Sequence, residues 1–176
     1  MADIPVLEDP RRVDPPFGTD ERTSLEAWLD YHRATLLLKC EGLDAATLRA
    51  RPVPTSLMSL QGLVRHMTEV ERAWFRRRFT NEDVPPLYYD RETNPEGDFE
   101  IPEDREWAED LAAWVAEVEA CRAVAAGRGL DEAGTHERTG ETVDLRWIYL
   151  HMIEEYARHN GHADLLRELA GGSVFE

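Results

Sequence analysis

The chain has 176 residues, of which 42% are hydrophobic, so we expect a single globular domain with a substantial core. Its formal net charge is −16, from 36 acidic and 20 basic residues. That charge repels phosphate backbones and anionic membrane surfaces, so we expect neither nucleic acid nor a membrane as a partner. No apolar run resembles a secretory signal or reaches the length of a membrane span, which predicts a cytoplasmic location.

The first residues are rich in proline, which predicts an extended N-terminal arm over residues 1–18. One domain is expected over residues 19–172. Its first helix is predicted for residues 20–42, with Thr23 and Glu26 matching a capping box at its start.

A short helical turn is predicted for residues 44–49, followed by a second long helix with Thr55 or Ser56 as its N-cap. The apolar residues of this helix recur at helical spacing and are expected to face inward. Its arginines, Arg72 and residues 76–78, are expected to point outward and to balance the helix dipole near the end of the helix.

A polar, proline-rich connection follows over residues 81–102, and at that length it must cross over the body of the molecule. A third helix is predicted from Pro102 to Gly127, a loop or small hairpin over residues 131–143, and a last helix over residues 144–169. Four long amphipathic helices with one long crossover predict an all-α four-helix bundle.

The two cysteines, Cys40 and Cys121, lie far apart and form no C-x-x-C motif. Each lies near the end of a predicted helix, on or beside its apolar face. We therefore expect buried free thiols instead of catalytic or redox cysteines.

The last predicted helix carries several groups that can bind a metal or transfer a proton. His151, Glu155 and His159 are spaced i, i+4, i+8, and His162 follows three residues later, so they share one helix face. Apolar residues such as Met152 fall on the same face, which should therefore be buried. Burying imidazoles and a carboxylate without partners is costly, and a metal ion would satisfy them.

The second predicted helix offers a third ligand, His66, which lies among inward-facing residues. Gly62, one turn earlier, would allow a close helix approach. Two imidazoles and a carboxylate, from His66, Glu155 and His159, suit a divalent transition metal and leave a coordination position open. The competing interpretation is that Glu155 and His159 are simply satisfied polar residues in a helix interface.

Four further residues are candidates for the surroundings of the site. His151 is expected to be a hydrogen-bond partner of a ligand or a pocket residue, and His162 a structural or supporting residue. His32 either faces the same cavity or is a satisfied core histidine. Glu69 could support His66 from one turn away, although a surface ion pair with a neighbouring arginine is favoured.

Two blocks of sequence resemble a known family. They are SLQGLVRHMTEVERAWF, residues 59–75, and LRWIYLHMIEEYARHNGHAD, residues 145–164. Together they resemble the DinB/YfiT-like superfamily of metalloenzymes, and the second block resembles its actinobacterial branch, often assigned as mycothiol S-transferase. The resemblance extends over nearly the whole chain except the arm. Lys39 is the only lysine, a bias typical of the high-GC genomes in which that branch occurs.

The resemblance implies a four-helix bundle and a metal held by three side chains, often three histidines. Carried over residue by residue, the ligands are His66, Glu155 and His159. Many relatives carry histidine where this chain has Glu155, and relatives resembling mycothiol-dependent maleylpyruvate isomerase carry glutamate. Zn²⁺ is the expected metal, with Ni²⁺, Mn²⁺ or Fe²⁺ as alternatives, because this donor set discriminates only modestly between them.

The function that follows from the resemblance is a metal-dependent transferase that conjugates a low-molecular-weight thiol, mycothiol, to an electrophilic small molecule. An isomerase or a hydrolase acting at the same site and a non-catalytic metal-binding stress protein are the alternatives. Tyr88, Tyr89 and Trp107 could form the contact surface of a homodimer, but a folded-back loop explains these aromatic residues equally well.

Overall fold

The computed structural model of the chain describes residues 11–136 and 139–172. Residues 1–10, which belong to the predicted arm, lie outside that part. The elements in chain order are α1 (Glu21–Cys40), α2 (Ala45–Arg49), α3 (Leu60–Glu71), the π-helix η1 (Arg72–Phe79), α4 (Trp107–Ala125), β1 (Ala133–Thr135), β2 (Thr142–Asp144) and α5 (Leu145–Leu169).

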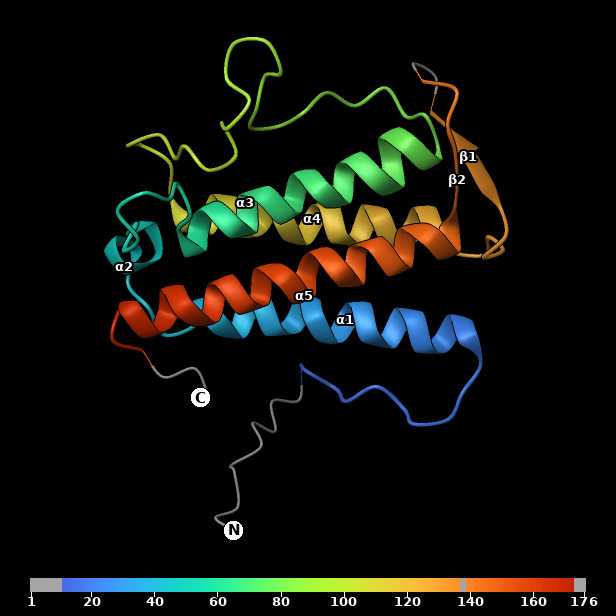
Figure 1. Cartoon of the computed structure of the whole chain (residues 1–176), viewed down its shortest axis with the longest axis horizontal. Helices are drawn as coiled ribbons and strands as arrows, with labels where there is room; N and C mark the ends of the chain where they lie inside the picture. The colour runs from blue at the N-terminus through green and yellow to red at the C-terminus, as the bar shows by residue number, and fades with distance from the viewer. Residues whose placement is uncertain (1–10, 137–138, 173–176) are drawn as a thin grey trace.

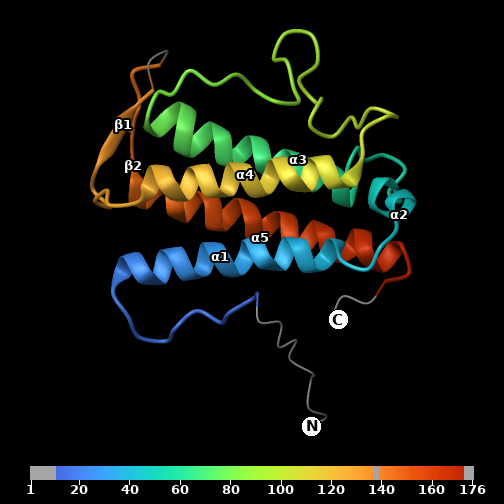
Figure 2. The ribbon, with the colours of Figure 1, turned by 180° about the vertical axis from the view of Figure 1, so that it is seen from behind.

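The long helices run side by side around one core, with α3 and α5 on one face of the molecule (Figure 1) and α4 and α1 on the opposite face (Figure 2). The most extensive packing is between α1 and α5 and between α3 and α4, and α3 also packs on α5. The expected all-α class is therefore confirmed, apart from a small antiparallel hairpin of β1 and β2. No described helix is long and apolar enough to cross a membrane.

The core is apolar and draws on every long helix. Each fully buried leucine or phenylalanine side chain contributes about 1.5–3 kcal/mol relative to an exposed one. The innermost residues include Leu29, Leu36, Leu63, Met67, Phe75, Trp114, Val118, Ile148, Met152 and Tyr156.

The capping residues of two helices differ from the prediction, although α1 begins at Glu21, within the predicted range. Asp20, and not Thr23, caps α1, because the Asp20 carboxylate accepts the backbone N–H of Thr23 at 3.0 Å. The second long helix begins at Leu60 with Ser59 as its cap, and the prediction of Thr55 or Ser56 was wrong. The Ser56 hydroxyl instead accepts the N–H of Met58 at 3.1 Å within a turn, so it is not available to a helix.

The third long helix also begins later than predicted. It starts at Trp107 behind a capping box of Glu106 and Glu109. The predicted start at Pro102 was wrong because the Arg49 guanidinium binds the carbonyl oxygens of Pro102 and Arg105, both at 2.6 Å. These contacts hold the segment in an irregular conformation.

The last helix begins as predicted. Asp144 caps α5, and its carboxylate accepts the N–H of Trp147 at 2.7 Å. Of the two alternatives predicted for residues 131–143, a loop or a small hairpin, the structure shows the hairpin, with Ala133 opposite Asp144 and Thr135 opposite Thr142.

The prediction that the arginines of η1 form a solvated helix end was wrong for Arg72. This residue is 8% exposed and donates hydrogen bonds to Glu117 of α4 at 2.7 Å and to the carbonyl of Pro85 at 2.8 Å. Arg76 donates to Glu117 at 2.9 Å. A buried carboxylate on the neighbouring helix therefore draws these cations inward. The widening of the helix to π geometry over Arg72–Phe79 was not predicted.

The connection between η1 and α4 crosses the outside of the helices as predicted (Figure 1). Arg65 of α3 donates to the carbonyl oxygens of Gly97 and Asp98, both at 2.9 Å. The same guanidinium stacks 3.9 Å above the ring of Tyr88, which is half-buried and consistent with a folded-back loop. Gly62 allows this connection to approach, because a Cβ there would lie 3.3 Å from the Phe99 ring.

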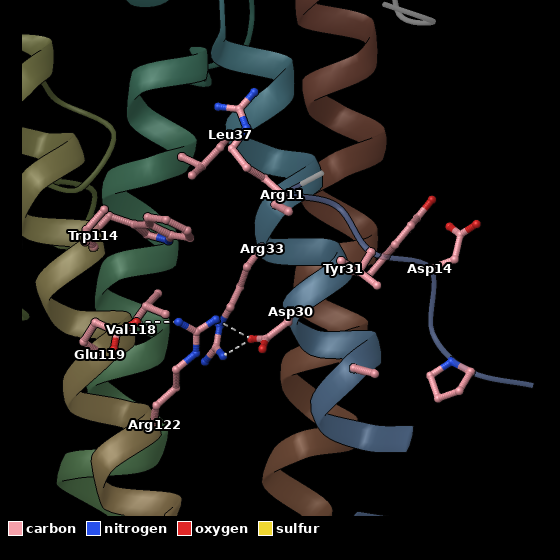
Figure 3. Close-up of a pocket in the computed structure, with 15 residues that line it drawn as sticks. Arg11, Asp14, Asp30, Tyr31, Arg33, Leu37, Trp114, Val118, Glu119 and Arg122 are labelled. Carbon is pink, nitrogen blue, oxygen red and sulfur yellow. Dashed lines mark hydrogen bonds and ion pairs between the residues drawn. The ribbon is translucent and has the colours of Figure 1, made fainter. Parts of the chain in front are cut away.

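Residues 11–19 contain no helix or strand and run back along α1 (Figure 3). The Arg11 guanidinium donates to both carboxylate oxygens of Glu41, at 3.0 and 2.7 Å. Arg12 lies 5.3 Å from the centre of the Tyr31 ring. The described part of the arm is thus extended and lies against the first helix.

Candidate metal centre

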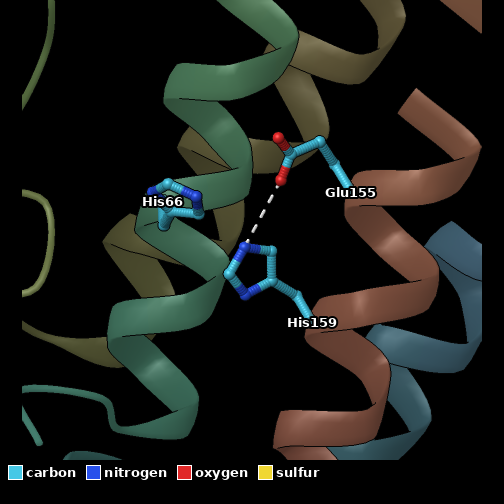
Figure 4. A group of neighbouring side chains, drawn as sticks. All are labelled: His66, Glu155 and His159. Atoms are coloured by element: carbon cyan, nitrogen blue, oxygen red, sulfur yellow. Dashed lines mark ion pairs between the residues drawn. The ribbon is translucent and has the colours of Figure 1, made fainter. Parts of the chain in front are cut away.

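Three side chains from two helices converge between α3 and α5 (Figure 4). His66 extends from α3, while Glu155 and His159 lie one turn apart on α5. A nitrogen of each imidazole and an oxygen of the carboxylate all lie within 4.8 Å of one another. His159 Nε2 is 3.5 Å from Glu155 Oε2, and the two imidazole centroids are 4.7 Å apart. The structure therefore brings together the three residues that the sequence predicted as ligands.

His159 lies in an environment that favours its neutral form. The residue is 8% exposed, and burial lowers its pKa to about 3, with further lowering by His66, His162 and Arg158. A neutral imidazole has a free nitrogen lone pair and is the form that binds metals.

His66 is oriented by residues of the crossing connection. Its Nδ1 lies 2.7 Å from Oδ2 of Asp98, a buried carboxylate, and its ring stacks on Phe99 with centroids 4.9 Å apart. Because a carboxylate accepts, we assign the proton to Nδ1, which leaves the Nε2 lone pair for another partner. Metal-binding histidines commonly show this arrangement. Asp98 was missed because nothing in its local sequence distinguishes it from the other acidic residues of the connection.

Glu155 is a half-buried carboxylate with one guanidinium nearby, that of Arg158, whose Nη1 lies 4.0 Å from Glu155 Oε2. Arg158 is exposed and makes its closer contact with Glu154. The neighbours of Glu155 are the imidazoles of His151 and His159. A partly desolvated anion beside neutral imidazoles favours a bound cation, and two nitrogens with one oxygen are donors that Zn²⁺ and similar divalent metals accept. These residues fit the metal that the resemblance implies.

Two of the remaining candidates border this group. His151 Nε2 lies 3.4 Å from Glu155 Oε1, and the His151 ring packs against both Trp74 and Trp147, with centroid distances of 4.4 and 4.9 Å. Burial lowers the pKa of His151. His162 Nδ1 lies 3.3 Å from Nδ1 of His159. Both histidines therefore touch one of the three converging residues.

His32 does not join the group. Its ring lies near Trp28 and Tyr31, with centroids 6.0 and 5.7 Å away, and its carbonyl oxygen accepts a hydrogen bond from Asn160 at 3.0 Å. Of the two interpretations left open for His32, these contacts favour the satisfied histidine.

The predicted surface ion pair of Glu69 was wrong. Glu69 is buried, and its carboxylate accepts the backbone N–H groups of Leu87 and Tyr88 in the crossing connection. Burial raises its pKa. Asp98 occupies the position beside His66 that Glu69 was considered for. Glu69 of α3 thus binds the connection, and Asp98 of the connection contacts His66 of α3.

One comparison with known proteins identifies a relationship. The family model described as Mycothiol-S-transferase matches residues 24–172. No curated protein matches the chain. The matched region includes all three converging residues and Asp98, and it begins within α1.

Proposed function

The chain belongs to the mycothiol-S-transferase family, and we propose that it conjugates mycothiol to an electrophilic small molecule at a metal held by His66, Glu155 and His159. In this proposal the four long helices form a four-helix bundle, and the α3–α5 interface holds the site. The observation that carries the proposal is the convergence of two imidazoles and a carboxylate within 4.8 Å, with one imidazole already oriented by Asp98.

A divalent metal bound there, with Zn²⁺ expected, supplies Lewis acidity that lowers the pKa of a thiol bound beside it. The protein contributes a fixed arrangement of donors. Asp98 holds the ring of His66, and Phe99 stacks on that ring. Glu155 supplies negative charge, and the burial of His159 keeps its imidazole neutral and able to donate a lone pair.

The nucleophilic sulfur must come from a cosubstrate. Cys40 and Cys121 are the only cysteines of the chain, and both are buried. Burial raises the pKa of Cys40 to about 12 and raises that of Cys121 as well, so neither forms a thiolate near neutral pH. In the transfer, the sulfur of the cosubstrate donates an electron pair to an electrophilic carbon. The S–H proton is released to solvent, an S–C bond forms, and the leaving group departs with the electron pair of its bond.

The test is conjugation of mycothiol to monochlorobimane by protein loaded with Zn²⁺, measured by fluorescence and by mass spectrometry of the product. We expect His66→Ala and His159→Ala each to lower the rate at least about 100-fold, because each removes a donor. His136→Ala, in the hairpin loop and outside the converging group, should retain the wild-type rate.

Each alternative function predicts a different outcome of these assays. Conjugation that survives the double variant His66→Ala/His159→Ala would contradict the mechanism. Turnover of an ester without any thiol indicates a hydrolase, and a product with the composition of its substrate indicates an isomerase. Stoichiometric metal without turnover of any probe favours a binding protein.

A further inference from the structure

A cavity is lined by residues of α1, α4 and the arm (Figure 3). Helices α1 and α4 lie on the opposite face of the molecule from α3 and α5 (Figure 2). The volume of the cavity is about 520 Å³. Pockets that bind small molecules typically measure about 300–1,000 Å³, so this cavity is large enough for such a ligand. None of the three converging residues lines it.

The walls of the cavity are mainly apolar. Ala27 and Ala34 are seven residues apart on one face of α1, and their small side chains leave space between the two helices. The arm residues Val13 and Pro16 cover part of the opening. The other apolar wall residues are Leu37, Trp114, Val115 and Val118.

One polar side chain of the cavity is buried and rigidly held. Arg33 lines the cavity but is only 5% exposed. Its guanidinium donates to both oxygens of the fully buried Glu71, at 2.7 and 2.8 Å, and to Asp30 at 2.9 Å. The charge of Arg33 is therefore already matched within the protein. A site held in this way needs little reorganisation on binding.

The charge at the opening is negative on balance. Three carboxylates line the opening, those of Asp14, Asp30 and Glu119. Because Glu71 neutralises Arg33, they outnumber the two remaining guanidinium groups, of Arg11 and Arg122. Arg33 and Arg122 both donate to Oδ1 of Asp30, at 2.9 and 2.8 Å, so Oδ2 is the oxygen of Asp30 that an ammonium group would face. Asp30 is exposed and lies where the apolar walls end. An ammonium group is attracted to this position, whereas a carboxylate is repelled.

We propose that the α1–α4 cavity binds an amphipathic amine, a small molecule with an apolar body and an ammonium head. The body packs against Trp114 and the aliphatic walls, and the head lies at Asp30. This ligand site is separate from the proposed metal centre and does not depend on the proposed function.

The experiment measures the fluorescence of N-phenyl-1-naphthylamine, a neutral apolar probe, with the full-length protein at pH 7.5. Octylamine and octanoate share their chain and differ in the charge of the head, so they serve as matched competitors. We expect octylamine to displace the probe at a concentration at least about 10-fold lower than octanoate. Asp30→Asn should remove most of that difference, because it removes the charge that the ammonium faces.

Two variants test whether the probe occupies this cavity. Ala34→Phe fills the space and should weaken probe binding at least about 10-fold, while Ala123→Phe, an exposed residue of α4 outside the cavity, should not. Circular dichroism and the melting temperature verify folding. Val115→Trp, at an exposed rim position, gives an independent test if Ala34→Phe does not fold. Unchanged probe binding in a folded filling variant, or equal competition by the two octyl compounds, would overturn the proposal.

Discussion

His66 illustrates how much of the candidate site depends on a single contact. The imidazole has two nitrogens, and the 2.7 Å contact with Asp98 engages Nδ1 and orients the ring. Without this carboxylate, the ring could rotate and either nitrogen could carry the proton. A fixed tautomer and orientation raise the affinity of a histidine for a metal.

We predict that Asp98→Ala weakens Zn²⁺ binding about 10–100-fold, measured by competition with a chromogenic chelator. Asp98→Asn should weaken binding less, because its amide oxygen can still accept from Nδ1–H. Asp104→Ala, an exposed residue of the same connection, is the control and should bind Zn²⁺ like the wild type. Wild-type affinity in Asp98→Ala would show that this contact does not support a metal site.

The two cysteines lead to a second prediction for single residues. Burial raises the pKa of both thiols, to about 12 for Cys40, so almost no thiolate is present at pH 8. Ellman's reagent should react with neither cysteine in the native protein within minutes and with both after denaturation in guanidinium. Rapid labelling of the native protein would show that a cysteine of the chain is reactive, and would contradict the inference that the reactive sulfur comes from a cosubstrate.

At the scale of elements, the irregular connection between η1 and α4 contributes to the candidate site because it carries Asp98, which contacts His66. Arg65 binds two of its carbonyl groups, Glu69 accepts two of its N–H groups, and Asp98 contacts His66. These contacts hold the connection against α3, and the connection in turn orients the imidazole of His66. The preceding helix has π geometry in η1, an irregularity often found next to functional sites.

A substitution at Gly97 tests whether the connection supports the candidate site. A Cβ at this position would lie 2.3 Å from the carbonyl oxygen of Tyr88, so Gly97→Ala must displace the segment next to Asp98. We expect Gly97→Ala to lower both the melting temperature and the Zn²⁺ affinity. Gly129→Ala is the matched control, because a Cβ there meets nothing within 4 Å and the melting temperature should change little. A Gly97→Ala protein that is destabilised but binds Zn²⁺ with wild-type affinity would show that the position of the connection does not affect metal binding.

Across the whole molecule, a buried polar network joins all four long helices. Arg33 of α1 donates to Glu71 of α3, which also accepts from the hydroxyl of Tyr156 of α5 at 3.0 Å. Trp114 of α4 donates its indole N–H to the same hydroxyl at 3.0 Å. Each group is satisfied by another helix, so the network favours one relative arrangement of the helices.

We predict that Glu71→Gln lowers the free energy of unfolding by about 3–5 kcal/mol, because it removes the buried counter-charge of Arg33 and leaves the guanidinium only the exposed carboxylate of Asp30. Urea denaturation measures the change, and Glu96→Gln, at an exposed position, should have little effect. The double variant Arg33→Met/Glu71→Leu should lose less stability than Glu71→Gln, because it leaves no unpaired charge. A loss below about 1 kcal/mol in Glu71→Gln would mean that Asp30 or water compensates the charge of Arg33.

Local sequence patterns predicted most of the helices and the members of the candidate site. Period-3.6 apolar residues predicted the long helices, and Asp144 predicted the start of α5, because capping depends on neighbouring residues. The i, i+4 spacing placed Glu155 and His159 together on α5. These features require only the geometry of one helix.

The remaining features depend on contacts between segments far apart in the chain. Asp98 reaches His66 across 32 positions, and Arg72 turns inward because Glu117 lies on another helix. The α1–α4 cavity exists only where two helices leave space between them. The sequence by itself therefore determined which helices form and which side chains could serve as ligands, since these follow from local periodicity. Only the tertiary structure decided how those ligands are oriented and which charges are buried, because electrostatic partners and desolvation arise when distant segments pack.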